Sequence, residues 1–546
     1  MDARVSARLP WLASHTLLAT AAASLLLCLF LYAAVHRSRR PPYPLPPGPP
    51  GRFLVGNLGQ VSEDHPELDY MRWGKEYNSD VIHIKVLGQH MICLNSVEAA
   101  TELLDRRGAN YCDRPRFTLF EVMGWGLTLT FLRWGPQFKL HRSLFQKTFT
   151  QSNVKVFRPL QLHEARKAVR TLLARPDSYE ETTLLLTTSV IFRIAFGQEI
   201  TDAASPYCAM AAAANDATTN GGIAGTSLVD VCPPARFLPD WLNPSAPLRH
   251  ARRSRAAIRT IHEVPWAASL KAIEAGTAPP SSFMRTHYER LQESRRTGTP
   301  TELTERDIKG ATGAVFIAGG NSTWSTVLSN LLFLTKYPAI QRAIQRELDA
   351  VLGVARQETG ETGEINGADT ATPGRLPTFD DRPHLPRLDR FMQEVLRTLP
   401  MNPLVIPHKS LREDEYRGMR IPAGSIVFAN TTAMASNPRV YRDPAVFDPD
   451  RYARAEDGGR GEPYPNGNFG FGRRKCPGNF LAMATVYVFL ATLLAVFDVD
   501  KVIGPDGAPV EPEPGVTIGL GGHPSPFVCK LRVRNPALAK LLEAEP

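Results

Sequence analysis

The chain has 546 residues, a formal net charge of +9, and 43% hydrophobic and 21% charged residues, a composition typical of a globular protein with one large domain or two or three ordinary ones. The modest basic excess favours an acidic partner or an anionic membrane surface, and no nucleic-acid-binding motif accompanies it, so nucleic acid is not expected as a partner. The seven cysteines are dispersed without C-x-x-C pairs, which argues against a disulfide framework or a structural zinc site and indicates a reducing compartment.

The N-terminal segment predicts a membrane anchor. After a tail of residues 1–10, residues 11–35 contain no acidic or basic side chain other than His15. A bilayer core needs about 20 apolar residues, whereas the apolar part of a secretory signal is shorter and ends at a small-residue cleavage site. We therefore expect a retained single-pass transmembrane helix, with a cleaved signal as the alternative. The excess of arginines after this run places the bulk of the chain in the cytosol.

Residues 36–51 are basic and then proline-rich, so they would form a stiff hinge, and residues 52–546 are expected to form one large domain. Alternation in residues 81–87 and 91–95 predicts a β-hairpin. Helical patterns dominate from about 96 to 350, where Thr304–Asp307 is a capping box that opens a long helix ending near Pro338. A solvated loop at 353–374 and short strands at about 404–428 follow, so the expected fold is mainly α with a minor β portion.

Two further runs, residues 311–334 and 477–497, contain no charged side chain. Each could be a membrane span or a helix buried in the centre of a large domain. The first run is rich in hydroxyl and amide side chains, and the second begins directly behind a cysteine-containing motif. We therefore expect both to be core helices.

The stretch FGFGRRKCPG, residues 469–478, places one cysteine in a setting suited to a thiolate. Pro477 fits the first position of a helix, so Cys476 would face free N–H groups and the positive end of the helix dipole. Arg473, Arg474 and Lys475 add positive charge, and these features together lower a thiol pKa.

The two nearest glycines of this stretch have their own consequences. Gly472 permits a tight turn, and Gly478 leaves room for a flat, bulky group. The residues alone leave two readings open, a thiolate that binds haem iron with an arginine at a propionate, and a buried, inert cysteine beside a solvated basic patch.

This stretch resembles the haem-binding signature of the cytochrome P-450 family at each fixed position, Phe469, Gly472, Arg474, Cys476 and Gly478. The resemblance implies the cytochrome P-450 fold and a single catalytic domain that binds haem b. It also implies that Cys476 is the axial metal ligand, that Arg474 pairs with a propionate, that Phe469 packs beside the sulfur and that Gly478 adjoins the cofactor. Arg473 and Lys475 have no fixed role in the family, and they would be solvated or face a partner.

A second motif of the family is Glu-x-x-Arg, present here as Glu394 and Arg397. Residues three apart share a helix face, and by itself such a pair is an exposed ion pair in most proteins. The resemblance implies that Arg451, in FDPDRY, joins them in a buried network with a structural role. Asp450 and Tyr452 depart from the usual form of that motif.

The stretch AGGNST, residues 318–323, lies within the long helix. Gly319 and Gly320 would leave space for dioxygen, or would simply allow close helix packing. The family usually has an acid followed by threonine here, and this chain has Asn321 and Ser322, with Thr323 adjacent. The resemblance implies catalytic roles for these three residues, but an amide does not shuttle protons as a carboxylate does.

Two further cations match propionate-binding positions of the family. Arg142 occupies the arginine of a Trp-x-x-x-Arg helix, where Phe138 replaces the tryptophan and removes its indole donor. His408, in PLVIPHK, corresponds to a basic residue that reaches the other propionate, with a surface histidine as the alternative. We expect residues 111–132 to roof the pocket and residues 526–534 to fold back near it.

The resemblance implies a monooxygenase that inserts one oxygen atom of O2 into a lipophilic small molecule. For a cytosolic domain anchored in the endoplasmic reticulum membrane, NADPH would supply electrons through a flavoprotein reductase docked on a basic surface that includes Lys139. A terpenoid or polyketide-like secondary metabolite is the expected substrate. Two alternatives stay open, a haem-thiolate isomerase or peroxygenase that needs no external electrons, and a non-enzymatic membrane haem-binding or sensor protein.

Overall fold

The computed structural model describes residues 43–202, 204–221, 227–242, 245–277, 279, 282–354, 374–517 and 522–545. The predicted anchor, residues 36–42 of the predicted hinge and most of the predicted loop at 353–374 lie outside these residues. The chain divides into two compact units. In the smaller one, residues 413–422 form a hairpin of β4 (Asp414–Tyr416) and β5 (Met419–Ile421), and the amide of Arg420 donates to the carbonyl of Pro44.

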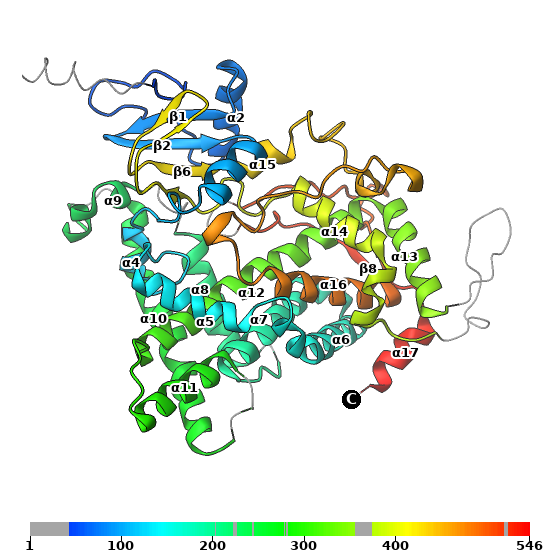
Figure 1. Cartoon of the computed structure of the whole chain (residues 1–546). Coiled ribbons are helices and arrows are strands. Elements are labelled where there is room, and N and C mark those ends of the chain that lie inside the picture. The colour runs from blue at the N-terminus through cyan, green and yellow to red at the C-terminus, as the bar shows by residue number, and fades with distance from the viewer. Residues whose placement is uncertain are drawn as a thin grey trace, which may run out of the picture. The chain divides into compact units, whose positions relative to one another are not determined.

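The larger unit, residues 47–412 and 423–546, is mainly helical (Figure 1). Its described α-helices are α2 (Pro66–Glu76), α3 (Val97–Ala100), α4 (Thr118–Met123), α5 (Pro136–Thr148), α6 (Arg158–Ala174), α7 (Tyr179–Phe196), α8 (Pro206–Thr219), α9 (Leu228–Val231), α10 (Ala246–Glu274), α11 (Phe283–Thr297), α12 (Glu305–Lys336), α13 (Pro338–Leu352), α14 (Pro386–Thr398), α15 (Thr431–Ala435), α16 (Asn479–Val496) and α17 (Pro536–Ala544). Short helical turns include η1 (Thr101–Arg106), η6 (Pro449–Tyr452) and η8 (Gly472–Arg474).

A small mixed sheet holds the strand that carries His408. Its order is β1 (Val81–Val86), β2 (Gln89–Leu94), β6 (Ile426–Ala429) and β3 (His408–Lys409). The strands β1 and β2 form the predicted antiparallel hairpin, β2 runs parallel to β6, and His408 lies opposite Val427. The predicted hairpin and the predicted short strands after residue 404 are therefore confirmed.

The C-terminal strand does not reach the site that the sequence suggested. Strand β8 (Lys530–Val533) pairs with β7 (Phe497–Asp500), which directly follows α16. None of residues 526–534 lines the main cavity. The expectation that this segment folds back near the pocket is wrong, because its backbone hydrogen bonds are made with β7 instead.

Helix α12 runs through the interior of the larger unit and begins as predicted. The Thr304 side chain accepts from the Asp307 amide while the Asp307 side chain accepts from the Thr304 amide, which completes the capping box. The helix ends at Lys336, two residues before Pro338, where a proline cannot continue the helical hydrogen bonds. Its partner α7 packs closely against it, and a Cβ at Gly319 would lie 2.5 Å from the Ile191 side chain.

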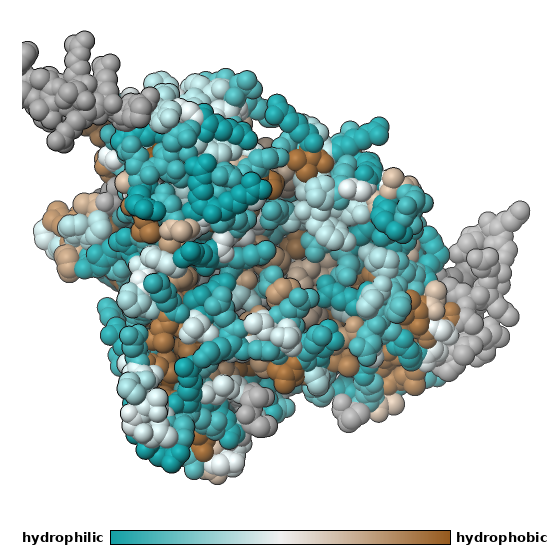
Figure 2. Space-filling view, viewed as in Figure 1, coloured by the Kyte–Doolittle hydropathy of each residue, from teal (hydrophilic) through white to brown (hydrophobic). Residues whose placement is uncertain are grey.

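Helix α16 is apolar on all sides because it lies in the core. Within the described ranges it is the one helix long and apolar enough to cross a membrane, yet 83% of that window is buried against other parts of the protein. The predicted core position of both charge-free runs is thus confirmed. On the face shown in Figure 2, side chains of the larger unit are mostly hydrophilic, and the hydrophobic ones form small scattered groups.

A saturated ion-pair network ties α14 to the segment around η6. Arg397 donates two hydrogen bonds of 2.8 Å to Glu394, and Arg451 donates to the same carboxylate at 3.0 Å. Glu394 and Arg451 are completely buried. The remaining donors of both arginines bind backbone carbonyls, including those of residues 435, 444 and 446.

Two members of this network were not identified from the sequence. Glu462 accepts from Arg451 at 2.7 Å, and the hydroxyl of Tyr452 donates to Glu394 at 2.6 Å. Tyr452, which departs from the usual motif, therefore adds a hydrogen bond to the buried carboxylate. Burial removes the hydration of each charged group, which is unfavourable unless the group is paired. The network is therefore stable only while every member keeps its partners.

We expect Glu394→Gln to lower the free energy of unfolding by about 3–5 kcal/mol, because it removes the counter-charge of Arg397 and one of the two carboxylates at Arg451. Denaturant titration followed by circular dichroism measures this loss. The matched control is Glu293→Gln, since Glu293 also pairs with an arginine three residues on, Arg296, but both side chains are exposed. No measurable loss is expected there, and equal losses in the two variants would contradict the assigned role.

Candidate functional site

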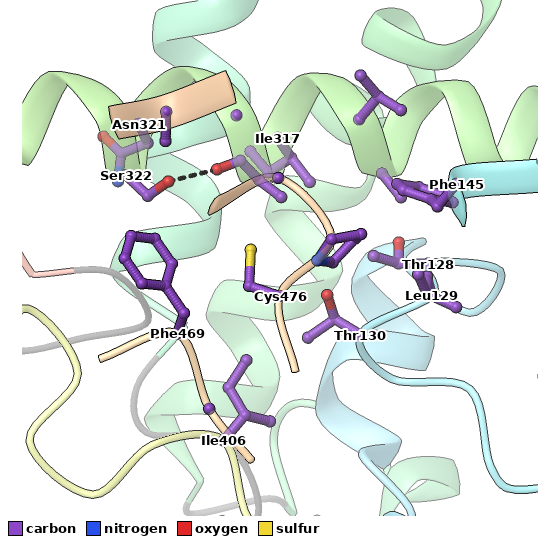
Figure 3. Close-up of a pocket in the computed structure, with 18 of the residues that line it drawn as sticks. Thr128, Leu129, Thr130, Phe145, Ile317, Asn321, Ser322, Ile406, Phe469 and Cys476 are labelled. Carbon is purple, nitrogen blue, oxygen red and sulfur yellow. Dashed lines mark hydrogen bonds between the residues drawn. The ribbon is translucent and has the colours of Figure 1, made fainter. Parts of the chain in front are cut away.

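A large cavity lies between α12 and the loop that carries Cys476 (Figure 3). It offers about 290 Å³ to the centres of water-sized molecules, whereas a single water needs about 10–15 Å³ by this measure. The predicted roof is confirmed, since Trp125, Thr128, Leu129, Thr130 and Phe131 line the cavity. Its other walls include Phe145, Val190, Ile191, Asn215, Ala314, Val315, Ile317, Ala318, Ile406, Leu481 and Ala482.

The loop that carries Cys476 is fixed by backbone contacts. The Cys476 amide donates to the carbonyl of Phe469 at 2.7 Å, which closes the loop on itself. At Gly472 the backbone has φ +55°, and an added Cβ would lie 2.0 Å from the Leu104 carbonyl oxygen of η1. The Gly472 amide also donates to the Asp105 side chain. Glycine is therefore required at position 472 both by its dihedral angle and by close packing.

The start of α16 differs from the prediction by two residues. The N-cap is Gly478 and the helix begins at Asn479, so Pro477 precedes the helix instead of occupying its first position. The closed loop holds Cys476 in a turn, and helical dihedral angles begin only after it. A Cβ at Gly478 would approach only the Cys476 sulfur, at 3.8 Å, so the space above this glycine belongs to the cavity.

The sulfur of Cys476 is open to the cavity and is directed toward α12 (Figure 3). Burial within the protein raises the pKa of this thiol, while the amides of Gly478 and Asn479 and the charge of Arg142 act in the opposite direction. The sequence predicted a lowered pKa from three neighbouring cations, but Arg473 and Lys475 are exposed. In the protein alone, loss of solvation thus outweighs the favourable charges.

Arg474 is buried and partly unsatisfied. Its Nε donates to the Cys112 carbonyl at 2.7 Å and its Nη1 to the Leu132 carbonyl at 2.8 Å. Its Nη2 is buried without a hydrogen-bond partner in the described part of the chain. The guanidinium lies 3.6 Å from the ring centre of Phe138. Phe138, which replaces the tryptophan of the family motif, therefore packs against Arg474. Burial lowers the pKa of Arg474 to about 10.

His408 has one nitrogen in use and one without a partner. A carbonyl can only accept, so Nδ1 donates to the Tyr111 oxygen, at 2.8 Å. Nε2 is buried and has no partner among the described residues. Burial and the neighbouring Arg114 lower the pKa of His408 well below its ordinary value, so the ring is neutral with an unused basic nitrogen.

Arg114 is a cavity residue that sequence analysis missed. Its Nη1 donates to the Pro407 carbonyl at 2.7 Å, and its buried Nε is unsatisfied within the described residues. The only signal in the sequence was an arginine followed by proline inside the predicted roof. Arg142 also lines the cavity. Its Nη1 donates to the Lys475 carbonyl at 2.7 Å and thereby holds the cysteine loop against α5.

On the opposite wall, α12 presents Asn321, Ser322 and Thr323 to the cavity. The Ser322 hydroxyl donates to the carbonyl of Ala318 at 2.6 Å, drawn as the dashed line in Figure 3. Ala318 and Gly319 both line the cavity, and a Cβ at Gly319 would collide with the Ile191 side chain. Gly319 thus serves close helix packing, one of the two alternatives that the sequence left open, and it also lines the cavity.

On the outside of the loop, two cations lie over one indole. Arg473 is 5.3 Å and Lys139 is 5.4 Å from the ring centre of Trp134. Cations over an aromatic face are attracted by its quadrupole. This outer set of three residues, which we call the outer cation face, joins the start of α5 to the cysteine loop.

Fold and site together define a protein that presents one accessible thiol and several inward-facing cations to a largely apolar cavity. The family model for cytochrome P-450 matches residues 46–530 of this chain. The chain therefore belongs to the cytochrome P-450 family, and it is a haem-dependent monooxygenase oxidoreductase.

Curated relatives from fungi are similar over nearly their full length. A cytochrome P-450 monooxygenase of Armillaria gallica is 33% identical over 92% of this chain and 94% of its own. Cytochrome P-450 monooxygenase 208 of Postia placenta is 34% identical over 96% of this chain and 97% of its own. Tryptamine 4-monooxygenase of Psilocybe cyanescens is 31% identical over 94% of this chain and 97% of its own.

We expect Gly472→Ala to lower the thermal midpoint strongly, because the new Cβ would collide with the Leu104 carbonyl. The control is Gly507→Ala, where φ is +78° and nothing lies within 4 Å of the added Cβ. Both variants share the cost of a positive φ, so the collision should add about 1–3 kcal/mol at position 472 alone. Comparable losses in both variants would show that the contact with η1 is not required.

Proposed function

We propose that this chain is an anchored cytochrome P-450 monooxygenase in which Cys476 binds the iron of haem b, and that its substrate is a lipophilic secondary metabolite. The observation that carries the assignment is the Cys476 sulfur facing a cavity whose buried cations have unused hydrogen-bonding atoms. A thiol needs positive charge to ionise when buried, and a metal ion supplies it, since a coordinating thiol is deprotonated outright.

The polar atoms without partners suit the two propionates of haem b. Arg474 Nη2 and Arg114 Nε are donors, and carboxylates are the acceptors that guanidinium groups bind best. His408 Nε2 would take up a proton when a carboxylate faces it, because the opposite charge favours the imidazolium. Arg142 lies close enough to act on Cys476 electrostatically and stabilises its thiolate. Phe469 and Gly478, which line the cavity beside the cysteine, would contact the cofactor.

Haem, when bound, supplies the activation of dioxygen, and a thiolate ligand favours O–O cleavage. The chain's own residues exclude water through the apolar walls and control protons on α12. The Ser322 hydroxyl can turn from the Ala318 carbonyl to donate into the cavity. Asn321 can donate a hydrogen bond but cannot release a proton, so proton delivery depends on water and on the hydroxyls of Ser322 and Thr323.

For the rest of the molecule we propose a transmembrane helix at residues 11–35 in the endoplasmic reticulum membrane, a hinge at 36–51 and a cytosolic catalytic domain at 52–546. Electrons would come from NADPH through a flavoprotein reductase. The outer cation face supports this partner, because its exposed cations Arg473 and Lys139, together with the exposed Lys475 of the cysteine loop, suit an acidic docking surface.

The proposed substrate class is a terpenoid or polyketide-like metabolite. Support comes from the apolar walls around the thiol, formed by Phe131, Val190, Ile191, Val315 and Ile317. One relative is named for tryptamine, and the others are named only as monooxygenases. Glu394, Arg397 and Arg451 are proposed to have a structural role, in agreement with their burial outside the cavity.

In the CO-bound, reduced protein we expect the red-shifted Soret band of thiolate ligation, and we expect Cys476→Ser to abolish it. The control is Cys112→Ser, which changes a buried cysteine whose own carbonyl accepts from Arg474. This variant should keep the band. Loss of the band in both variants, or its retention in Cys476→Ser, would overturn the assignment of Cys476.

The Asn321–Ser322 pair favours one second candidate, an isomerase or peroxygenase that uses no external electrons. Turnover with ¹⁸O-labelled O2, NADPH and a reductase separates the two functions. A monooxygenase incorporates the label into product, whereas continued turnover without label would establish the alternative.

Under the same conditions, Ser322→Ala is expected to increase the hydrogen peroxide released per NADPH by about tenfold, because one proton donor is lost. The matched control is Ser329→Ala on the same helix, whose hydroxyl also donates to the carbonyl four residues earlier but does not line the cavity. Equal peroxide release from both variants would exclude a catalytic role for Ser322.

A further inference from the structure

We propose that the substrate is a neutral lipophilic alcohol whose hydroxyl group donates a hydrogen bond to Asn215. This inference rests on the proposed function and narrows its substrate class. It is carried by two polar side chains that line the cavity, are at least nine-tenths buried and have oxygen atoms without partners in the described part of the chain.

The first of these side chains is Asn215 on α8. Its side chain is 9% exposed, and its Oδ1 has no hydrogen-bond partner among the described residues. Three residues on, and on the same helix face, the Thr218 hydroxyl donates to the Ala214 carbonyl at 2.6 Å and accepts from the Trp125 indole at 3.0 Å. Thr218 thus has its hydrogen-bond partners in Ala214 and Trp125, and the side-chain amide of Asn215 is left facing the cavity.

The second side chain is Thr128 on the roof loop. It is 2% exposed, and its Oγ1 is also without a partner within the described ranges. Its backbone is fixed, because its amide donates to the Trp125 carbonyl and its carbonyl accepts from Phe131, each at 2.9 Å. The hydroxyl faces the cavity on the side away from Phe469 (Figure 3), where it offers a second hydrogen-bonding position.

A buried acceptor without a partner is unfavourable, and a site built this way rejects ligands that lack the matching donor. An alcohol that donates to Asn215 Oδ1 satisfies this acceptor. An ether of the same shape cannot donate, so it would leave Oδ1 unsatisfied. Hydrogen-bonding side chains amid apolar walls are typical of sites that orient one polar group of a hydrophobic ligand.

The charges of the lining residues indicate that the substrate is neutral. The described residues around the cavity include three arginines but no aspartate or glutamate. An ammonium group would lose its hydration there without gaining a counter-ion, and it would face cations. A carboxylate would compete for the arginines that we assign to the propionates. A neutral hydroxyl avoids both conflicts.

The test uses the full-length, haem-loaded protein and isothermal titration calorimetry. The probes are farnesol and drimenol, each compared with its methyl ether and with the corresponding primary amine, so the apolar body is constant within a series. In at least one series the alcohol should bind about tenfold more tightly than the ether, the equivalent of one net hydrogen bond. The amine should bind more weakly than the alcohol.

Three variants assign the effect. Asn215→Leu should reduce the preference for alcohol over ether to less than about twofold. Asn215→Asp, which keeps the size of the side chain, should make the amine the preferred ligand. The control is Thr187→Val, another cavity threonine, whose hydroxyl is already satisfied by the Leu184 carbonyl at 3.2 Å. It should leave the preference unchanged.

The proposal is overturned if no probe binds, if the ether binds as tightly as the alcohol, if the wild-type protein prefers the amine, or if Asn215→Leu and Asn215→Asp both leave the preferences unchanged. The CO-difference spectrum of the same preparation keeps this result separate from the assignment of Cys476. A preparation with the thiolate band but without the alcohol preference refutes only the substrate inference.

Discussion

Buried cations bonded to backbone carbonyls, and not to carboxylates, govern the structure around the cavity. The hydrogen bonds described for Arg114 and Arg474 all end on carbonyl oxygens, of residues 112, 132, 406 and 407. These bonds join the roof, the cysteine loop and the segment leading to β3. Carbonyls hold the guanidinium groups in place but do not neutralise them, so the wall retains positive charge and unused donors. An anionic cofactor is the group that would complete this arrangement.

The network at Glu394 is the opposite case in the same protein. There the arginines meet carboxylates and carbonyls, and each described donor has a partner. Such a site is complete without any ligand and can only stabilise the fold. The contrast between the saturated network and the incomplete set around Cys476 supports the proposal that the first set of arginines is structural and the second binds the cofactor.

The sequence predicted the parts of the fold that depend on local pattern. The hairpin of β1 and β2 follows from alternation, the start of α12 from the Thr304–Asp307 capping box, and the core position of α16 from its lack of charge. Sequence motifs also located five site and network residues, namely Glu394, Arg397, Arg451, Cys476 and Arg474. Their mutual contacts required the structure.

What the sequence did not predict depends on tertiary surroundings. The pKa of Cys476 is governed by burial, which outweighs the adjacent cations because two of them point to solvent. For Gly319 the sequence left two alternatives open, and its packing against Ile191 depends on a helix far away in the chain. Arg114 bonds to carbonyls of residues 406 and 407, which lie 292 and 293 residues away. No local sequence pattern indicates this contact, the pairing of Glu462 with Arg451, or the unsatisfied oxygen of Asn215.

The outer cation face and the inner arginines should differ in their response to ionic strength. Arg473 and Lys139 lie over Trp134 at the protein surface. There, dissolved ions screen the interaction between charges over a distance of about 10 Å at 0.1 M salt. Arg474, one residue further along the loop, is shielded by the protein. Added salt therefore weakens the attraction of Arg473 and Lys139 to Trp134 and any electrostatic docking at this surface. The interior side of the same loop keeps its geometry. Two consecutive arginines thus give one loop a salt-sensitive side and a salt-insensitive side.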